Sequence, residues 1–291
     1  MTIIVDSGST KADWCVVENG VVVANFSTQG ITPVHQTEQQ IKDIIQRELL
    51  SSCSFKSLFP SDDKTVDCHF YCSGCLPDKA EWFKSVLDGL FASFGISVHV
   101  YNDLLGAARA LCGRSPGIAC ILGTGANSCL YDGQNIIANT PPLGYILGDE
   151  GSGANLGKRF LNGIFKGWLD KELLHGYLEW SGLDYAAVIS RVYREPMPNR
   201  YLASIVPYIK SRVGDCMQLD RMIIDAFRDF LLLNLSPYSR TDIPVHFTGG
   251  VANAFEEQLR KAAALEHYNV GSVVAKPIGN LIIYHTELKV K

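Results

Sequence analysis

Apolar residues at the start of the chain fall into short runs of the kind that form strands. Residues 2–5, 14–17 and 21–26 are three such runs, rich in Val, Ile and aromatic side chains. Asn19-Gly20 separates the second run from the third, and Asn-Gly between apolar runs is the strongest local signal for a hairpin. We therefore expect the chain to begin with a three-stranded antiparallel meander.

The apolar pattern then alternates between helical and extended spacing. After a loop at 30–35, the spacing of Ile41, Ile44, Ile45 and Leu49 predicts a helix over 36–50. A polar stretch at 51–64 is expected to be a loop. Strands are predicted at 66–72 and 96–101, and helices at 77–94 and 103–111. Three strands followed by this alternation indicate a mixed sheet with helices packed on it.

The opening pattern recurs after a break at residues 114–117. Strands are predicted at 118–122, 127–131 and 136–138, with a second glycine-rich turn between the first two. We place the domain boundary here, with an N-terminal domain at 1–113 and a C-terminal domain at 114–291. The second half is expected to carry these further elements: a glycine-rich segment at 141–153, helices at 154–168, 184–193, 201–212 and 217–235, a strand at 245–248 and a helix at 251–264. A terminal helix at 277–288 can pack back on the first domain.

Composition and charge exclude several classes of protein. The 291 residues are 47% hydrophobic, which is enough for a sizeable core, and carry a formal net charge of -4. An acidic balance without a basic cluster argues against a nucleic-acid-binding surface. No apolar run approaches the length of a membrane span, and no secretory signal precedes the first strand. With an odd number of cysteines, nine in all, we expect a cytoplasmic protein without a membrane or nucleic-acid partner.

The turn after the first strand has the residues of an anion-binding site. Asp6 is followed by Ser7-Gly8-Ser9-Thr10 and then by Lys11. Small side chains let several backbone N–H groups point at one anion, and Lys11 adds a positive charge. Asp6 is placed to hold a divalent cation through water. An ordinary hairpin with a polar turn remains the alternative.

Two further glycine turns also follow apolar strands. Gly123-Thr124-Gly125-Ala126-Asn127 repeats the first turn in the second half, and Gly249-Gly250 joins the strand at 245–248 to a helix. Two such turns facing each other can hold the β- and γ-phosphates of a nucleotide, and the third can hold its nucleoside. The alternative is three unrelated tight turns.

Two acidic sites accompany the glycine turns. Asn102-Asp103 lies between a strand and a helix, where Asp103 serves either as a helix N-cap or as a general base. Phosphoryl transfer needs one carboxylate to accept the hydroxyl proton. Asp149 and Glu150 lie among glycines before a helix, where acids favour the helix dipole. Their functional interpretation is that Asp149 accepts hydrogen bonds from sugar hydroxyls and Glu150 binds sugar or orders water around the metal.

The cysteines at 68–75 form a candidate metal site. Cys68, His69, Cys72 and Cys75 form half of a zinc or iron–sulfur signature, but most of them fall on a predicted buried strand, so we favour a structural role. The chain contains no P-loop, dinucleotide-binding, zinc-protease or nucleophile-elbow motif.

These motifs together resemble the BadF/BadG/BcrA/BcrD ATPase family, and within it the N-acetylglucosamine kinases of the sugar kinase, Hsp70 and actin superfamily. The resemblance rests on residues 6–14, 102–103, 123–127, 148–153 and 247–253 and covers nearly the whole chain. It implies an α/β fold of two ribonuclease-H-like, actin-like ATPase domains with ATP and Mg²⁺ bound in an interdomain nucleotide cleft. It also implies roles for individual residues. The phosphates or other parts of ATP would be bound by Ser7, Gly8, Ser9, Thr10, Lys11, Gly123, Thr124, Gly125, Gly249 and Gly250, and Asp6 would bind Mg²⁺ through water. Asp103 would be the catalytic base for the sugar 6-hydroxyl, and the sugar would be bound by Asn102, Asp103, Asn127, Asp149 and Glu150.

The chain departs from this family at one loop. The N-acetylglucosamine kinases carry a sugar-binding Asn after the third strand, whereas the loop here reads Gly30-Ile31-Thr32-Pro33-Val34-His35. The resemblance therefore implies a kinase for N-acetylglucosamine, a related amino sugar or another hexose, and a homodimer. An iron–sulfur activator of a radical dehydratase, from another branch of the family, is the alternative. Such activators carry an IGGQD-like second turn, where this chain has LGTGAN at 122–127.

Overall fold

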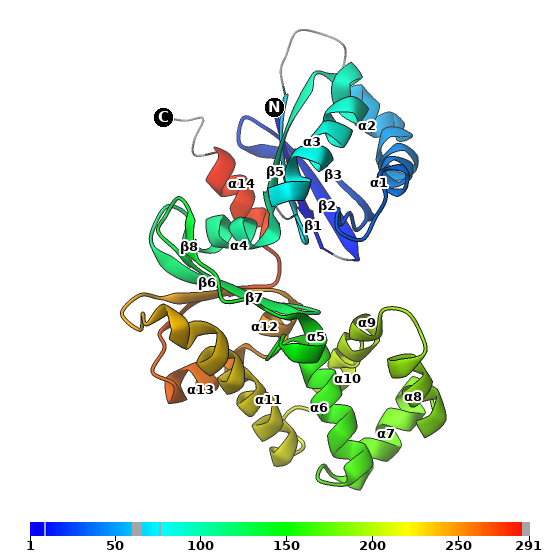
Figure 1. The fold of residues 1–291 in the computed structure, drawn as a ribbon, viewed down its shortest axis with the longest axis vertical. Helices are drawn as coiled ribbons and strands as arrows, with labels where there is room; N and C mark the ends of the chain where they lie inside the picture. Colours follow the sequence, from blue (N-terminus) through cyan, green and yellow to red (C-terminus); the bar gives the residue numbers. More distant parts are fainter. Residues whose placement is uncertain (9, 60–65, 76, 287–291) are drawn as a thin grey trace. The chain divides into compact units, whose positions relative to one another are not determined.

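The protein is built from two compact units, each formed around one five-stranded sheet (Figure 1). The computed structural model describes residues 1–8, 10–59, 66–75 and 77–286. The first unit comprises Met1–Gly113 and the C-terminal segment from Pro277, and the second comprises Arg114–Lys276.

The first sheet has the strand order β3-β2-β1-β4-β5. Its strands are β1 (Thr2–Ser7), β2 (Lys11–Glu18), β3 (Val21–Gln29), β4 (Val66–Cys72) and β5 (Ile96–Asn102). The first three form the predicted antiparallel meander, while β4 and β5 run parallel to β1. Asn19 and Gly20 have φ of 51° and 79°, the left-handed conformation that a two-residue hairpin requires.

Helices of the first unit lie on both faces of this sheet. They are α1 (Glu38–Ile44), η1 (Ile45–Leu50), α2 (Cys53–Leu58), α3 (Pro77–Phe91), η2 (Ala92–Phe94), α4 (Asp103–Cys112) and α14 (Ile278–Thr286). The predicted loop at 51–64 was wrong at its start, because α2 occupies part of it and residues 60–64 lie outside the described residues. Ser52 caps α2, and Phe55 is fully buried against Phe26 and Phe59. The six residues of α2, fewer than two helical turns, are too few to show periodicity in the sequence.

The two faces of the first sheet differ in polarity. One face packs Trp14 and Phe70, with ring centroids 5.3 Å apart, against apolar residues of α1 and α3. The other face packs Ile4 and Tyr71 against α4 and α14, which lie side by side (Figure 1). The C-terminal helix therefore belongs to the core of the first unit.

A polar network attaches α14 to the sheet. The Tyr71 hydroxyl is hydrogen-bonded to His285 Nε2 at 2.7 Å and accepts a hydrogen bond from Arg109 Nη1 at 2.9 Å. The Arg109 guanidinium lies 4.4 Å from the Tyr101 ring centroid, and the His69 ring stacks on His285 at 3.8 Å. Stacked rings and a cation over an aromatic face add to the apolar burial of Leu281 in holding this helix.

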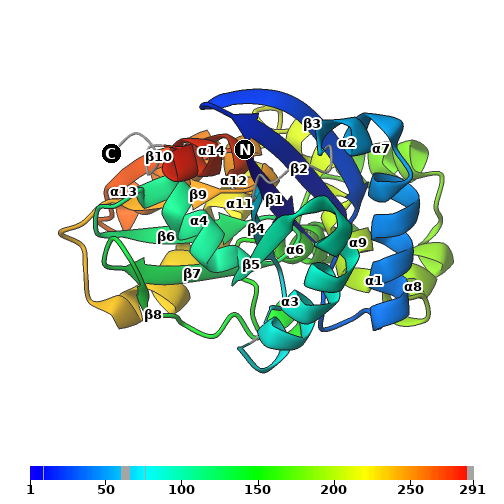
Figure 2. The ribbon, with the colours of Figure 1, turned by 90° about the horizontal axis from the view of Figure 1, so that it is seen from above.

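The second sheet repeats the strand arrangement of the first (Figure 2). Its order is β10-β9-β6-β7-β8, with β6 (Gly117–Leu122), β7 (Ala126–Tyr131), β8 (Ile136–Ala138), β9 (Val245–Thr248) and β10 (Val270–Val274). Read from the meander outward, both sheets place the third, second, first, fourth and fifth strands in this order. The prediction of two ribonuclease-H-like domains is confirmed. Strand β10 was not predicted, because Gly271 and Ser272 interrupt its apolar pattern.

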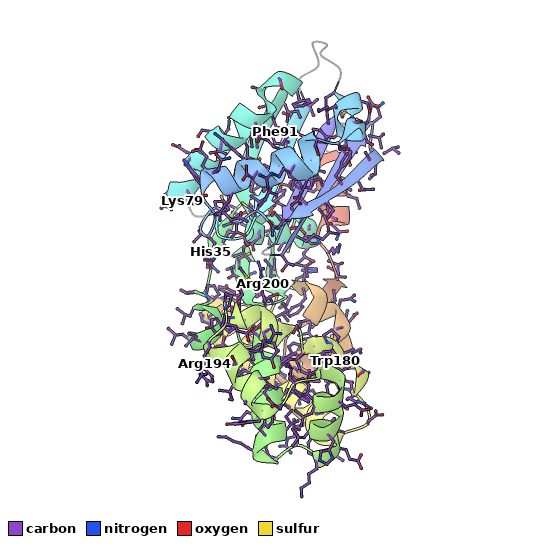
Figure 3. The ribbon with its side chains drawn as sticks, turned by 90° about the vertical axis from the view of Figure 1, so that its right-hand side faces the viewer. His35, Lys79, Phe91, Trp180, Arg194 and Arg200 are labelled. Carbon is purple, nitrogen blue, oxygen red and sulfur yellow. The ribbon has the colours of Figure 1, made fainter. Side chains whose placement is uncertain are left out.

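Helices make up the rest of the second unit. They are α5 (Gly144–Leu147), α6 (Gly153–Lys166), α7 (Lys171–Ser181), α8 (Tyr185–Tyr193), α9 (Pro198–Ala203), α10 (Val206–Ser211), α11 (Met217–Phe230), η3 (Leu231–Leu235), η4 (Ser236–Tyr238), α12 (Gly250–Ala254) and α13 (Glu256–Leu265). Trp180, Arg194 and Arg200 lie in the helical region that contains α7 to α9 (Figure 3).

Three predictions for these helices need correction. Helix α7 was missed, although Leu173 and Tyr177 are buried at helical spacing. The predicted helix at 201–212 is two helices, α9 and α10, and the predicted helix at 251–264 divides at Phe255. Within the described part of the chain, no helix has the length and apolar character that a membrane span requires.

Candidate active site

The predicted residues of the first unit lie at one edge of its sheet. Strands β1, β4 and β5 are parallel, and their register places Ser7, Cys72 and Asn102 side by side at the carboxyl ends. Ligands of open α/β sheets bind beyond this edge. Asp6 and Asp103 are each one residue from this row, so the sheet brings the first glycine turn and the proposed base to the same end of the unit.

The turn after β1 is closed by backbone hydrogen bonds. Gly8 N–H donates to the Lys11 carbonyl at 3.0 Å, and Gly30 N–H donates to the Thr10 carbonyl at 3.0 Å. Among the described residues, a Cβ at Gly8 would have only the Lys11 carbonyl near it, at 3.7 Å, so they leave open space there. Ser9, a predicted phosphate-binding residue, lies outside the described residues.

Ser7 and Lys11 have structural partners that the sequence did not indicate. Ser7 is fully buried; its hydroxyl donates to the Ile31 carbonyl at 3.0 Å and accepts from Ile31 N–H at 2.8 Å. Its side chain therefore holds the 30–35 loop. Lys11 Nζ lies 2.7 Å from Asp13 Oδ1, so this pair reduces the positive charge that Lys11 offers to an anion.

Asp103 is the first residue of α4, and the helix is capped by its neighbour. The Asn102 side chain accepts a hydrogen bond from Leu105 N–H at 2.7 Å, which makes Asn102 the N-cap. The interpretation of Asp103 as the cap is therefore wrong, and Asn102 Oδ1 is engaged by the helix. Burial raises the pKa of the Asp103 carboxyl, and backbone N–H groups of Leu104 and Asp103 partly oppose this rise. A raised pKa makes a carboxylate a stronger base.

The two glycine turns of the second unit meet at adjacent strand ends. Strands β6 and β9 are parallel, with Ile121 opposite Thr248. Gly249 follows with φ of 121°, and a Cβ built on it would lie 2.3 Å from the Leu122 carbonyl oxygen and 3.2 Å from Gly123 N. Only glycine permits this approach of one turn to the other. Gly250 begins α12 and has open space around it.

Asp149 lies directly against the second turn. It has φ of 55°, and its Oδ1 accepts a hydrogen bond from Ala126 N–H at 3.0 Å. A Cβ at Gly125 would lie 3.0 Å from Asp149 Oδ2, so the glycine leaves room for the carboxylate. Burial raises the pKa of Asp149, the Ala126 hydrogen bond lowers it, and the charge of Glu150 raises it further.

The N-terminus of α6 stabilises this turn. Gly153 N–H donates to the Gly123 carbonyl at 2.8 Å and Ala154 N–H donates to the Thr124 carbonyl at 3.1 Å. Ser152, which is fully buried, caps the helix by accepting from Asn155 N–H at 3.1 Å. These donors serve the turn itself, which fixes the segment 149–153 against residues 123–125.

Asn127 and Glu150 are held by polar residues that sequence reasoning missed. Asn127 Oδ1 accepts hydrogen bonds from Ser128 N–H and from Asn139 Nδ2, each at 2.9 Å. Glu150 Oε2 accepts from Asn234 Nδ2 at 3.1 Å. Asn234 is a buried polar residue. Its place within the apolar run 231–235 is the sequence feature that could have indicated a positioning role.

The cysteine cluster is buried, as expected. Cys68, Cys72 and Cys75 belong to the core on the apolar face of the first sheet. Within the described residues, no three His, Cys, Asp or Glu side chains gather closely enough to hold a metal ion. All nine cysteines of the chain are described, and none of them forms a disulfide.

Comparisons with known proteins identify the relatives of this chain. A Porphyromonas gingivalis protein assigned as an N-acetylglucosamine kinase is 42% identical, with a TM-score of 0.93 and 99% of each chain covered. A Chromobacterium violaceum protein with the same assignment is 20% identical, with a TM-score of 0.72 over 97% of this chain and 98% of that chain. The N-acetylmuramic acid/N-acetylglucosamine kinase of Clostridium acetobutylicum is 24% identical over 275 residues, which are 86% of this chain and 87% of that protein. No family model matches the chain. The identity and coverage of the first relative show that the chain belongs to the N-acetylglucosamine kinase family of sugar kinases.

Proposed function

We propose that this protein transfers the γ-phosphoryl group of ATP to a hydroxyl of a sugar, the 6-hydroxyl of N-acetylglucosamine or of a related amino sugar or hexose. The observation that carries the proposal is the position of Asp103. It is a partly exposed carboxylate at the carboxyl edge of three parallel strands, its pKa is raised by burial, and the adjacent Asn102 takes the capping role. Because Asn102 caps the helix, the Asp103 carboxylate can accept a proton from the acceptor hydroxyl.

In this mechanism the protein positions the reactants and one carboxylate moves a proton. Phosphoryl transfer requires little covalent chemistry from the enzyme, so orientation and charge neutralisation provide most of the rate. The ionised Asp103 accepts the hydroxyl proton as the new O–P bond forms, and its raised pKa favours that transfer.

The glycine turns are proposed to bind ATP. The backbone of the turn at Ser7, Gly8, Ser9, Thr10 and Lys11 would hold one phosphate, the turn at Gly123, Thr124 and Gly125 another, and Gly249 and Gly250 would contact the adenosine. The open space at Gly8, Gly123 and Gly250 supports these assignments.

The carboxylates at the end of β1 and the start of β2 suit Mg²⁺. Asp6 lies directly opposite Asp13 in the β1–β2 pairing, so two carboxylates lie at one edge. Mg²⁺ uses one or two carboxylates, keeps several waters and binds substrate phosphates. Asp6 would hold the ion through water, where the ion would neutralise phosphate charge.

Asp149 and Asn127 are the proposed sugar ligands of the second unit. Asp149 is fixed by Ala126 N–H, which leaves its other carboxylate oxygen for a sugar hydroxyl. Glu150 and Asn102 are assigned to sugar binding with less support, because Asn234 and Leu105 engage their side chains. The loop at 30–35 contains no Asn, so recognition of an N-acyl group must use other residues. The radical-dehydratase activator receives no support from the turn at 122–127, which has the kinase-like sequence LGTGAN. A homodimer is expected from the family.

The test is ADP release by the purified protein with ATP, Mg²⁺ and a panel of hexoses, amino sugars and N-acylated sugars. The Asp103→Asn variant should lose roughly 100-fold or more in kcat, the usual contribution of general acid–base catalysis, while ATP affinity is retained. Asp215→Asn, at an exposed position of the second unit, is the control and should keep wild-type activity. Near wild-type turnover in Asp103→Asn would contradict the assignment of the base, and ADP release unaffected by every sugar would contradict the proposed reaction.

A further inference from the structure

A pair of cysteines lies in a tight turn at the carboxyl end of β4. Cys72 is the last residue of the strand, Ser73 and Gly74 form the turn with Gly74 at φ of 69°, and Cys75 follows. The first and last Cα atoms of a four-residue turn lie within about 7 Å of each other. Disulfides span Cα separations of roughly 4.4–6.8 Å, so this backbone is suited to a bridge between the two sulfurs.

The two thiols lie close enough for each to act on the pKa of the other. Cys72 is fully buried, whereas Cys75 is 7% exposed. The interaction between them raises the pKa of Cys72, together with its burial, and lowers the pKa of Cys75. A thiol with a lowered pKa is the nucleophile in C-x-x-C motifs. Cys75 is therefore the attacking sulfur and Cys72 the resolving one.

The turn that carries these thiols is joined to the proposed acceptor site. Ser73 N–H donates to the Ser7 carbonyl at 3.2 Å, which links the turn to the end of β1. Cys72 lies opposite Asn102, the residue before Asp103. The negative charge of Asp103 also acts on both thiols, raising the pKa of each.

The same turn packs against the 30–35 loop. A Cβ at Gly74 would lie 3.1 Å from Val34 and 3.3 Å from Thr32, so the two loops are in close contact. His35, at the end of that loop, is labelled in Figure 3. A change in the turn is therefore transmitted both to the 30–35 loop and to the end of β1.

We propose that Cys72 and Cys75 are a modification site at which a low-molecular-weight disulfide, such as glutathione disulfide, forms a reversible Cys72–Cys75 bridge that switches off sugar phosphorylation. Formation of the bridge is independent of the proposed function, whereas its effect on turnover rests on that function. Asp103 and Ser7 are the residues through which the effect is transmitted.

The exchange proceeds in two balanced steps. The Cys75 thiolate attacks one sulfur of glutathione disulfide, which forms a mixed disulfide and releases one glutathione thiolate. The Cys72 thiol gives its proton to that thiolate, and its sulfur then attacks the Cys75 sulfur and releases the second glutathione. In sum, two protein thiols are oxidised and one glutathione disulfide is reduced to two glutathiones.

The bridge fixes the two sulfurs at a bond length of about 2.05 Å. The turn must adjust, and with it the Ser73–Ser7 hydrogen bond and the pairing of Cys72 with Asn102. A displacement of about 1 Å at a reacting group costs roughly 100-fold in rate. We expect oxidation to lower kcat/KM for the sugar by at least about tenfold.

The experiment treats the full-length protein with glutathione disulfide and then with dithiothreitol. After alkylation of free thiols, trypsin releases residues 65–79 as one peptide that contains Cys68, Cys72 and Cys75. The bridge appears in that peptide as the loss of two hydrogens and a single alkylated cysteine, Cys68. Kinase activity is measured in the oxidised and in the reduced state. The activity of each oxidised protein, wild type or variant, is compared with that of the same protein fully reduced. Cys75→Ser and Cys72→Ala should lose the response, and Cys68→Ala, at a buried position of the same strand, should keep it.

The possible results separate the existence of the bridge from the proposed sugar phosphorylation. A bridged peptide together with a reversible fall in activity, absent from Cys75→Ser, supports the proposal. A peptide with three alkylated cysteines after oxidation overturns it, and so does a bridged protein with unchanged activity. A reduced protein that phosphorylates no sugar contradicts the proposed function instead, while the peptide still reports whether the modification site exists.

Discussion

Gly249 combines a backbone conformation and a close backbone contact that only glycine permits. Its φ of 121° lies in a region that L-residues rarely adopt, and an added Cβ would lie 2.3 Å from the Leu122 carbonyl oxygen and 2.7 Å from the Leu122 carbonyl carbon. Both contacts are with the backbone of a central strand, so no side-chain rotation relieves them. The substitution Gly249→Ala must therefore shift β6, β9 or the turn between β9 and α12.

The expected cost combines two effects. A non-glycine residue in a glycine-only backbone conformation costs about 1–3 kcal/mol. Overpacking against immobile atoms adds about 1–3 kcal/mol. We expect Gly249→Ala to lower the free energy of unfolding of the second unit by about 2–6 kcal/mol. For a domain of this size each kcal/mol shifts Tm by about 2–4 °C, so its transition should fall by roughly 4–24 °C.

The neighbouring glycine provides the matched control. A Cβ built at Gly250 has no atom of the described part of the chain within 4 Å, and Gly250 begins α12, where alanine is tolerated. Gly250→Ala should keep the unfolding free energy within about 0.5 kcal/mol of the wild type. Differential scanning calorimetry of both variants measures the difference. A Gly249→Ala protein that melts like Gly250→Ala would refute the steric reasoning. Because Gly250→Ala preserves the fold, an increase in its KM for ATP would then report on the adenosine site itself.

Three further predictions address the pH profile, the C-terminal helix and the sugar site. Burial raises the pKa of Asp103 above its ordinary value of 3.8, and the base must be ionised to accept a proton. We therefore expect kcat/KM to decrease as the pH falls through that raised pKa. The residual activity of Asp103→Asn should not show this decrease. Burial of the ionised form opposes folding once the pH exceeds the unfolded pKa, so Asp103→Asn should not lower Tm at neutral pH; a large decrease would contradict this. Leu281→Ala removes a fully buried side chain between α14 and the sheet, so urea unfolding should show a first unit that is less stable by about 2–5 kcal/mol. Ile283→Ala, at a 54% exposed position of the same helix, should change the unfolding free energy little. Gly125→Ala places a Cβ 3.0 Å from Asp149 Oδ2 and should raise the KM for the sugar by roughly tenfold, about 1.4 kcal/mol. An unchanged KM for the sugar would remove Asp149 from the sugar site.

Local patterns were sufficient for most strands and for the glycine turns. Apolar runs rich in β-branched and aromatic residues, separated by glycine-containing turns, predicted β1 to β9. The turns at Asn19-Gly20 and Gly249-Gly250 were recognisable because positive φ strongly favours glycine and asparagine. Strand β10 was missed because Gly271 and Ser272 interrupt its apolar pattern.

Partners far apart in the sequence were decided by packing. Nothing near Glu150 indicates that Asn234 donates to it, and nothing near Tyr71 indicates that His285 and Arg109 meet at its hydroxyl. These contacts depend on how helices settle on a sheet, which no local period encodes. The choice between Asn102 and Asp103 as helix cap was also open in the sequence, because both side chains are good caps, and it was settled by the φ of -76° and ψ of 156° at Asn102.

The sequence was therefore enough to establish the repeated meander, the glycine turns and the acidic residues beside them, since these depend on backbone conformation within a few residues. Only the tertiary structure showed that Ser7, Cys72 and Asn102 end in one row and that Gly249 presses against Leu122. The physical reason is that parallel pairing joins strands separated by long stretches of chain. Their carboxyl ends become neighbours only when the sheet has formed, and the chemistry at that edge depends on which residues arrive there together.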